Sequence, residues 1–215
     1  GKIINVMDDD NDREVIIETT LLNYDIPSQF GAGVLKQANS YQEPTEKEIN
    51  GRTDVRQLPL VTIDGEDSRD FDDAVYAEKR SGGNYRVVVA IADVSHYVTP
   101  NSALDHEAFE RGTSVYFPHH VVPMLPEVLS NGLCSLNPGV DRLCMVADIK
   151  LSRAGNITGY EFYPSVMHSQ ARLTYNQVND YFDGNLENVP ESLTGNKDVK
   201  KSVDTMHQLY KVLVK

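Results

Sequence analysis

The alternation of apolar and polar residues along the chain predicts a β-rich fold with several amphipathic helices. Runs rich in Val, Ile and Tyr are separated by short polar turns, and the turn Ser81-Gly82-Gly83-Asn84 is typical of a β-hairpin. A second pair of apolar runs flanks the turn at residues 153–156 and predicts a second hairpin. The predicted strands cover residues 58–64, 74–80, 85–98, 143–152 and 157–169.

Helical patterns lie between and after these strands. Ser102 is a suitable N-cap, and Thr45 with Glu48 three residues later forms a capping box. Apolar residues between Val199 and Leu213 recur at steps of 4, 3, 4 and 3, which places them on one face of a helix. The predicted helices cover residues 45–50, 102–111, 125–133, 174–182 and 199–213.

The N-terminal part has a different pattern. Residues 1–7 and 13–22 resemble two strands separated by the polar turn 8–12. A two-stranded hairpin is not stable alone, so we expect partner strands earlier in the chain. Residues 25–58 mix Pro, Gly and charge and are interpreted as a connector with one short helix. The last predicted helix reaches the final residue without a stop signal. Together with the missing partner strands at the start, this leads us to expect a chain truncated at both ends.

Composition excludes several classes of protein. Of the 215 residues 40% are hydrophobic, enough for a buried core, and no apolar run approaches the ~20 residues that span a bilayer. Cys134 and Cys144 match neither a disulfide framework nor a zinc site, so we interpret them as small buried hydrophobic residues. A reducing compartment is favoured, and we expect a cytoplasmic protein with no membrane partner.

The charge of the chain is concentrated in two places. The net charge of −12, from 20 Lys and Arg against 32 Asp and Glu, would repel a phosphate backbone if it were spread evenly. However, residues 1–50 carry −6 and Asp64–Asp73 carry −5, which leaves −1 for the rest. The acidity is local, so it does not by itself exclude a nucleic-acid substrate.

The most informative segment has six acids between Asp64 and Asp73. Two unit charges ~4 Å apart repel by about 1 kcal/mol in water and by more when partly buried, so the cluster requires an explanation. Asp64 ends one predicted strand, and Asp70 and Asp72 lead into the next, projecting to the same side of an extended chain while Asp73 projects to the other. Adjacent strands of one sheet would bring carboxylates from both ends together.

Two interpretations of this acidic segment stay open from the residues alone. A hard cation such as Mg²⁺, which prefers oxygen ligands, would explain the cluster, and so would a solvated acidic turn. A calcium loop is a poor fit, because the EF-hand spacing fails here and also at Asp8–Asp12, where Arg13 stands at the position that requires Gly.

Three longer segments resemble the catalytic (RNB) domain of the ribonuclease II / ribonuclease R family, and most of all its bacterial ribonuclease R branch: TIDGEDSRDFDDAV, VVVAIADVSHYV and GTSVYFPHHVVPMLPEVLSNGLCSLNPGVDRLCMV. The similarity is nearly continuous from Leu58 to Tyr175. It implies an α+β fold with a mixed, mainly antiparallel sheet. On this basis residues 1–30 would be the closing strands of a cold-shock OB-fold barrel, residues 31–57 a linker, and residues 58–215 the N-terminal half of the RNB domain.

The resemblance also implies an activity and a metal site. Family members are processive, Mg²⁺-dependent, 3′→5′ hydrolytic exoribonucleases that release nucleoside 5′-monophosphates. The four acidic positions of the family correspond to Asp64, Asp70, Asp72 and Asp73, expected as metal ligands and catalytic residues. A two-metal site is implied, with Mn²⁺ as a possible substitute for Mg²⁺. Asp72 is the residue whose loss should most damage the chemistry while sparing RNA binding.

One further position and one partner follow from the resemblance. Tyr116 matches the family tyrosine that stacks on the base at the RNA 3′ end, although the residues alone would equally fit a core tyrosine. The expected partner is single-stranded or structured RNA with a free 3′ end, bound by a monomer. His96, His119 and His120 are assigned no catalytic role and are expected as surface or packing groups.

The family's second half lies beyond the residues seen here. It supplies an arginine near the scissile phosphate, a glutamate near the metals and a second stacking aromatic, so the isolated fragment is expected to be inactive. A catalytically inactive RNA-binding relative is one alternative, which the four intact Asp positions argue against. A metal-binding structural domain is another, which the segment around Tyr116 argues against.

Overall fold

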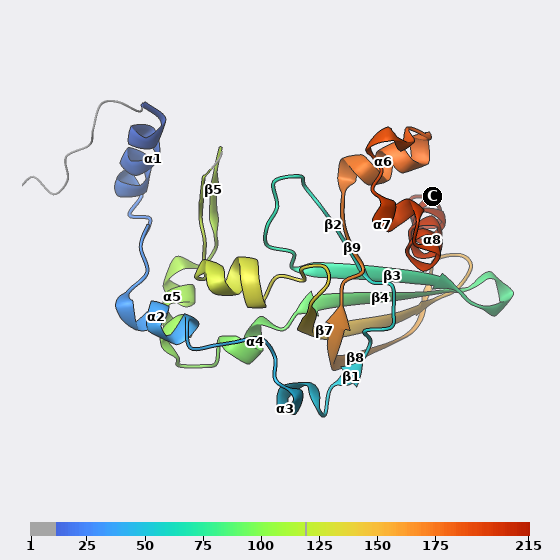
Figure 1. Ribbon diagram of the computed structural model, residues 1–215, viewed down its shortest axis with the longest axis horizontal. Helices are drawn as coiled ribbons and strands as arrows, with labels where there is room; N and C mark the ends of the chain where they lie inside the picture. The colour runs from blue at the N-terminus through green and yellow to red at the C-terminus, as the bar shows by residue number, and fades with distance from the viewer. Residues whose placement is uncertain (1–11, 119) are drawn as a thin grey trace, which may run out of the picture. The chain divides into compact units, whose positions relative to one another are not determined.

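The computed structural model describes residues 12–118 and 120–215. These divide into two compact units (Figure 1). The larger unit contains residues 42–97 and 128–215, and the smaller contains the described residues up to Tyr41 together with residues 98–127. The strand predicted over residues 1–7 lies outside the described residues, as does His119.

A seven-stranded sheet forms the centre of the larger unit. Its strand order is β1-β8-β7-β4-β3-β2-β9, and all neighbours are antiparallel except the pairs β1–β8 and β2–β9. The prediction of a mixed, mainly antiparallel α+β fold is confirmed. The strands are β1 (Thr53–Asp54), β2 (Val61–Asp64), β3 (Asp73–Lys79), β4 (Tyr85–Ala92), β7 (Asp141–Leu151), β8 (Ile157–His168) and β9 (Ala171–Thr174).

The two predicted hairpins are present. The β3–β4 hairpin turns at Ser81–Gly83, where Gly82 and Gly83 have positive φ angles that favour glycine, and β7 pairs with β8. The strand predicted over residues 85–98 is too long, because β4 ends at Ala92 and a short helix, α4 (Val94–Tyr97), follows.

The residue that follows β4, Asp93, carries a buried carboxylate. Asp93 is 7% exposed and pairs with Arg52 at 2.7 Å, and its Oδ1 accepts a hydrogen bond from the hydroxyl of Ser95. Burial opposes ionisation of Asp93, but the hydrogen bonds from Ser95 and Arg52 outweigh it and lower the pKa. The amide of Asp93 still donates to the carbonyl of Leu143 on β7 at 3.0 Å, so the chain leaves the sheet only after this residue.

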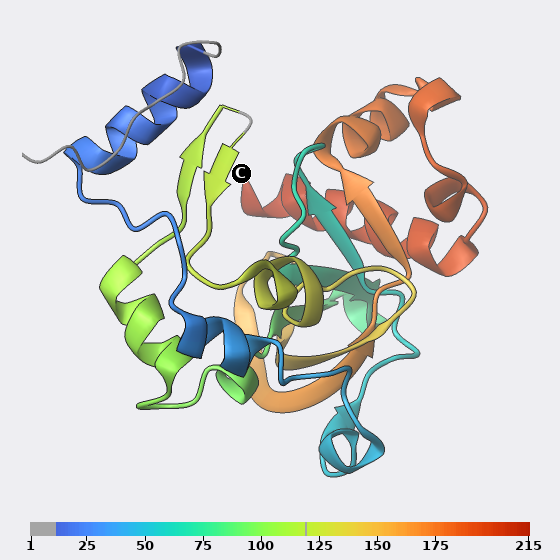
Figure 2. The same ribbon diagram turned by 60° about the vertical axis from the view of Figure 1, so that its left-hand side comes forward.

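Strand β9 was not predicted. It has four residues and lies parallel to β2 (Figure 2). Val61 is opposite Ala171, and Asp64 is opposite Thr174. Such a short strand has no periodicity of its own and is defined by its partner. Its effect is to enclose β2 between β3 and β9, so the strand that carries Asp64 is an interior strand of the sheet.

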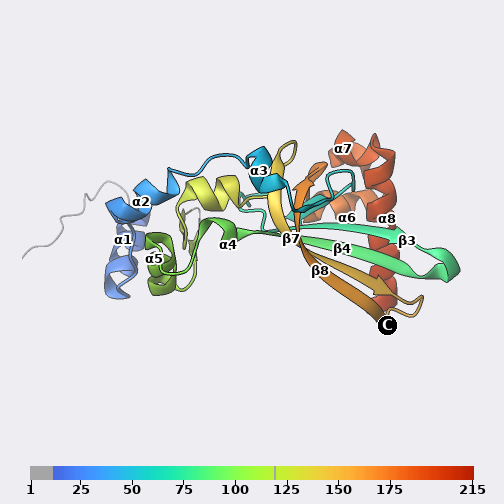
Figure 3. The same cartoon turned by 90° about the horizontal axis from the view of Figure 1, so that it is seen from below.

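Helices at the C-terminal end cover one part of the sheet and form its apolar core. Helix α8 (Lys197–Leu213) packs across β3 (Figure 3), as the apolar spacing predicted. Before it come α6 (Tyr175–Asp183), which Gly184 ends at φ 83°, the 3₁₀ turn Leu186–Asn188 and α7 (Glu191–Thr194). The buried residues of this core are Val61, Ala171, Leu173, Leu193, Val199 and Val203.

The other predicted helices of the larger unit are also found, with changed bounds. Helix α3 (Glu46–Ile49) begins with the capping box of Thr45 and Glu48, and the hydroxyl and amide groups of Thr45 lower the pKa of Glu48 to about 2. The helix predicted over residues 125–133 is a π-helix, η2 (Val128–Leu133). Cys134 and Cys144 are buried thiols, as predicted, and burial raises the pKa of each to about 12.

The smaller unit contains α1 (Asp12–Asn23), α2 (Ala32–Ala38), α5 (Ala103–Arg111) and the hairpin of β5 (Val115–Phe117) and β6 (His120–Val122). Helix α5 has the predicted Ser102 cap. It packs against α2, and its last residue, Arg111, donates hydrogen bonds to the carbonyls of Pro27 and Gln29 at 2.8 Å while its guanidinium lies over the ring of Phe30. The bonds to those carbonyls anchor the chain that leads into α2.

The strand predicted over residues 13–22 is wrong, because this segment is helix α1. The β-branched residues that suggested a strand are tolerated in the helix, where the Thr20 hydroxyl donates to the carbonyl of Ile16 at 2.7 Å. The second of the two strands expected for an OB-fold is therefore not present in the structure. The assignment of residues 1–30 to a cold-shock domain stays a prediction.

Within the described residues no helix is both long and apolar enough to cross a bilayer.

Candidate active site

The acidic segment connects two neighbouring strands, as predicted. Strand β2 ends at Asp64 and β3 begins at Asp73, with Val61 opposite Val75. Continuing that antiparallel register would place residue 72 opposite Asp64. The main chain of Asp72 is also held, since its carbonyl accepts the amide of Ala92 at 2.9 Å. We refer to residues 65–72 as the acidic loop.

The four predicted aspartates lie within electrostatic range of one another. Burial raises the pKa of Asp64, and the carboxylates of Asp73, Asp70 and Asp72 raise it further against the opposing effect of Arg172. The pKa of Asp72 is also raised, first by partial desolvation and then by the negative charges of Asp70 and Asp73. Asp72 nevertheless keeps enough accessible surface to be classed as exposed. The four acids at the junction of β2 and β3 therefore act electrostatically on one another, and their repulsion favours a bound cation.

The oxygen atoms of the four aspartates suit a divalent cation, but they do not form a complete set of ligands. The Oδ2 atom of Asp64 is buried and has no hydrogen-bond partner within residues 12–118 and 120–215. An ionised carboxylate oxygen can only accept, so such an atom suits a hard metal ion. In the same described residues, however, no group of three or more His, Cys, Asp or Glu side chains is arranged to hold a metal. The donors fit a divalent cation by atom type and charge, without forming a finished coordination sphere.

The repulsion in this cluster predicts an unusual pH dependence. A carboxyl group with a raised pKa in the folded state destabilises the fold above that pKa and stops doing so as the pH falls toward its unfolded value. With metal removed by EDTA, Asp72→Asn is therefore expected to raise the free energy of unfolding at pH 7 by about 1 kcal/mol, the cost of one close like-charge pair in water. The gain should disappear as the pH approaches 4.

Thermal unfolding at a series of pH values measures this effect, and about 2–4 °C is expected at pH 7 for a domain of this size. Asp183→Asn, at the exposed C-terminal end of α6, is the control. A destabilised Asp72→Asn protein at pH 7, or a gain that persists unchanged at pH 4, would contradict the prediction.

A buried serine holds one half of the acidic loop. The Oγ atom of Ser135 accepts the amide of Phe71 at 3.0 Å and donates to the carbonyl of Arg69 at 2.9 Å. The next amide, that of Leu136, donates to the carbonyl of Phe71 at 2.8 Å. These contacts come from a segment more than 60 residues away, which is why no local pattern in the sequence revealed them.

An arginine on β9 holds the other half. Arg172 donates to the carbonyl of Glu66 at 2.6 Å, and its guanidinium lies 5.2 Å from the ring centre of Phe71. It is also the positive group that opposes the rise in the pKa of Asp64. Sequence reasoning missed Arg172, although it is the one Lys or Arg between Arg153 and Lys197 and could have been noted for that reason.

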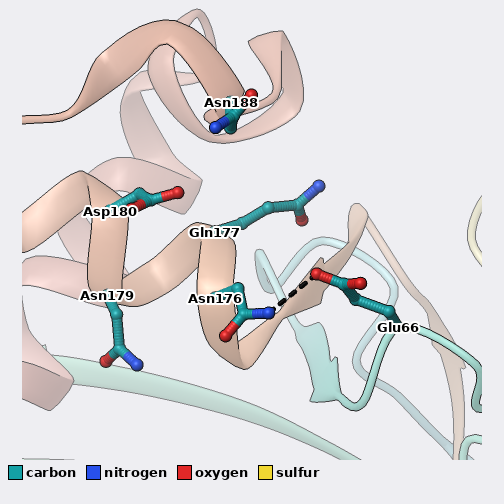
Figure 4. Close-up of a pocket in the computed structure, with 6 residues that line it drawn as sticks. All are labelled: Glu66, Asn176, Gln177, Asn179, Asp180 and Asn188. Atoms are coloured by element: carbon teal, nitrogen blue, oxygen red, sulfur yellow. Dashed lines mark hydrogen bonds between the residues drawn. The ribbon is translucent and has the colours of Figure 1, made fainter.

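A polar depression lies beside the acidic loop (Figure 4). The side chain of Asn176, at the start of α6, donates to Glu66 at 2.8 Å across its edge. None of the predicted site residues lines it. The depression has a volume of about 520 Å³ and is lined by Glu66, Asn176, Gln177, Asn179, Asp180 and Asn188.

The remaining predicted residues lie elsewhere. Tyr116 belongs to the smaller unit, on β5 opposite Val121, and is 65% exposed. Its predicted role in base stacking stays a prediction. His96 contacts Glu48 at 3.0 Å and packs edge-on against Tyr97, which agrees with a packing role.

Comparison with known proteins shows the family of this chain. Ribonuclease R of Escherichia coli (strain K12) is 51% identical over all of this chain, and that of Vibrio cholerae is 50% identical over 99% of it. The chain spans only 26% of the length of these curated relatives. A solved structure of Mycoplasma genitalium RNase R in complex with double-stranded RNA covers 95% of this chain, with a TM-score of 0.87 and 36% identity, and the chain covers 35% of that protein. Residues 52–215 match the family described as RNB domain, so the chain belongs to the RNB-domain family.

Proposed function

We propose that the protein carrying this chain is a Mg²⁺-dependent, processive 3′→5′ exoribonuclease that releases nucleoside 5′-monophosphates from RNA. The observation that carries the proposal is the cluster of Asp64, Asp70, Asp72 and Asp73 at the junction of β2 and β3, with an unpartnered buried oxygen on Asp64 in the described part of the chain. The Mycoplasma genitalium relatives, solved with double-stranded RNA and with ribose-methylated single-stranded RNA, support RNA as the substrate class.

The proposed chemistry places all four acids in one set of metal ligands. Asp64, Asp70 and Asp73 would hold the metal, Mg²⁺ or in its place Mn²⁺, through carboxylate oxygens. When bound, such ions supply an activated water and charge stabilisation for in-line hydrolysis of a phosphodiester. Asp72, whose pKa is raised by desolvation and by the carboxylates of Asp70 and Asp73, joins this ligand set. Its loss is expected to damage the chemistry most while sparing RNA binding. Ser135 holds the main chain of the loop between these ligands.

The proposal extends to partners and location. RNA with a free 3′ end, single-stranded or structured, is the proposed substrate, and the proposed enzyme acts as a monomer. Cys134 and Cys144 are buried thiols and are not paired with each other, which supports a reducing, cytoplasmic location.

Product analysis with the full-length natural protein tests the function directly. RNA labelled at its 5′ end should shorten from the 3′ end with Mg²⁺ or Mn²⁺ present, should release 5′-monophosphates, and should remain intact in EDTA. Binding of RNA without any metal-dependent shortening would instead identify an inactive RNA-binding relative. Internal cleavage products would also contradict the proposal.

Tyr116→Ala in the full-length protein is expected to weaken binding of a short single-stranded RNA by roughly 5- to 150-fold. Stacking of a base on an aromatic ring contributes about 1–3 kcal/mol and does not depend on the base, which suits an enzyme that degrades any sequence. Fluorescence anisotropy in EDTA measures the affinity without hydrolysis.

The control for this variant is Phe109→Ala, which removes an aromatic ring that is 83% exposed in the same unit. Equal RNA affinities of the Tyr116 and Phe109 variants would exclude a specific stacking role for Tyr116.

A further inference from the structure

A single buried hydroxyl, that of Ser135, forms hydrogen bonds with main-chain groups on both sides of Asp70. Ser135 has no exposed surface, and its Oγ lies 3.0 Å from the amide nitrogen of Phe71 and 2.9 Å from the carbonyl oxygen of Arg69. A hydroxyl can accept and donate at once, so one atom fixes the peptide groups that flank Asp70 and precede Asp72. The orientation of two predicted metal ligands therefore depends on a buried residue that is not itself one of the predicted ligands.

Ser135 is itself held firmly. Its amide donates to the carbonyl of Gly132 at 3.1 Å, and its carbonyl accepts the Nε–H of Arg142 at 3.0 Å. Arg142 is only 5% exposed and is paired with Glu43. Because the amide and the carbonyl of Ser135 are both hydrogen-bonded, its main chain is fixed, and its hydroxyl can hold the acidic loop in one conformation.

We propose that Ser135 is a positioning residue of the candidate nuclease site, acting through the main chain of the acidic loop to keep Asp70 and Asp72 in the arrangement that binds metal. The inference rests on the proposed function. Four mutually repelling carboxylates separate unless the backbone holds them, and Ser135 supplies that restraint. Partners in the outer shell of metal sites commonly change metal affinity by about 10- to 100-fold when they are removed.

The chain offers a matched control for the loss of a buried serine. Ser202, on α8, is 1% exposed, and its Oγ accepts the amide of Ala77 at 3.1 Å. The contact is of the same kind, from a buried hydroxyl to a backbone amide of the same sheet, but it meets the middle of β3 rather than the acidic loop. Ser202→Ala should therefore reproduce the cost in stability without affecting the metal site.

The test measures Mn²⁺ binding to the full-length protein without RNA, by electron paramagnetic resonance or calorimetry. Ser135→Ala is expected to bind Mn²⁺ about 10- to 100-fold more weakly than wild type, and Ser202→Ala within about twofold of it. In the hydrolysis assay, the metal concentration at half-maximal rate should rise for Ser135→Ala alone, with the KM for RNA unchanged. Ser135→Thr, which retains the hydroxyl, should recover metal affinity.

The outcomes separate this inference from the proposed function. Wild-type protein that binds no Mn²⁺ and does not hydrolyse RNA overturns the proposed function. An active wild type with equal Mn²⁺ affinities for Ser135→Ala and Ser202→Ala overturns only the role of Ser135. If Ser135→Ala does not fold, Ser135→Cys, a similar-sized side chain with a weaker hydrogen-bonding group, is judged by the same two results.

Discussion

Asp72→Asn in the full-length protein is expected to lower the rate of mononucleotide release by about 10²- to 10³-fold, the cost of losing one group that supports transition-state charge stabilisation, while RNA affinity changes by less than about twofold. Asparagine keeps the shape of the side chain and removes its charge, and Asp72 is held in place by its main chain, whose carbonyl accepts the amide of Ala92. Single-turnover hydrolysis and RNA binding in EDTA measure the two quantities separately.

The expected rise in metal-free stability makes the Asp72 result easy to interpret. Since the substitution removes repulsion from Asp70 and Asp73, a loss of activity cannot be attributed to unfolding if the thermal midpoint rises as expected. Asp183→Asn serves again as the control and should keep wild-type activity. Substantial turnover by Asp72→Asn would refute the assignment of Asp72, and a parallel loss of RNA binding would refute the separation of binding from chemistry.

Local signals in the sequence were sufficient for much of the fold. The two hairpins have alternating apolar residues and polar turns, and α8 has an apolar stripe, so each could be predicted from its own segment. Helix α1 could not, because its Val, Ile and Thr residues are typical of strands while its helical state is set by context. Strand β9 could not either, since four residues next to β2 form a strand only through that pairing.

In the candidate site, too, some features could be predicted from the local sequence and others could not. The spacing of the acids between Asp64 and Asp73 indicated a metal site and the meeting of two strand ends, and the structure confirms that the strands are neighbours. The groups that hold the acidic loop were not predictable, because Ser135 and Arg172 lie about 65 and 105 residues away from their partners along the chain. Contacts over such separations leave no periodic signal in the sequence.

Leu173→Ala is expected to lower the free energy of unfolding by about 2–5 kcal/mol, because it removes a large side chain from a close-packed core and leaves a cavity. Leu173, on β9, has no exposed surface and belongs to the buried cluster that contains Val61 of β2 and Val203 of α8. At about 2–4 °C per kcal/mol, the thermal midpoint of this domain should fall by roughly 4–20 °C.

The position of Leu173 connects this loss of stability to the candidate site. Its neighbour Arg172 holds the acidic loop through the carbonyl of Glu66, and β9 flanks the strand that ends at Asp64. Weaker packing of β9 should therefore weaken Mn²⁺ binding as well, by loosening the strand that carries Arg172. Leu186→Ala, at a side chain 55% exposed beside the same helices, should change neither property. A Leu173→Ala protein that loses stability and retains wild-type Mn²⁺ affinity would show that the acidic loop is held independently of β9 packing, with Ser135 as its main support.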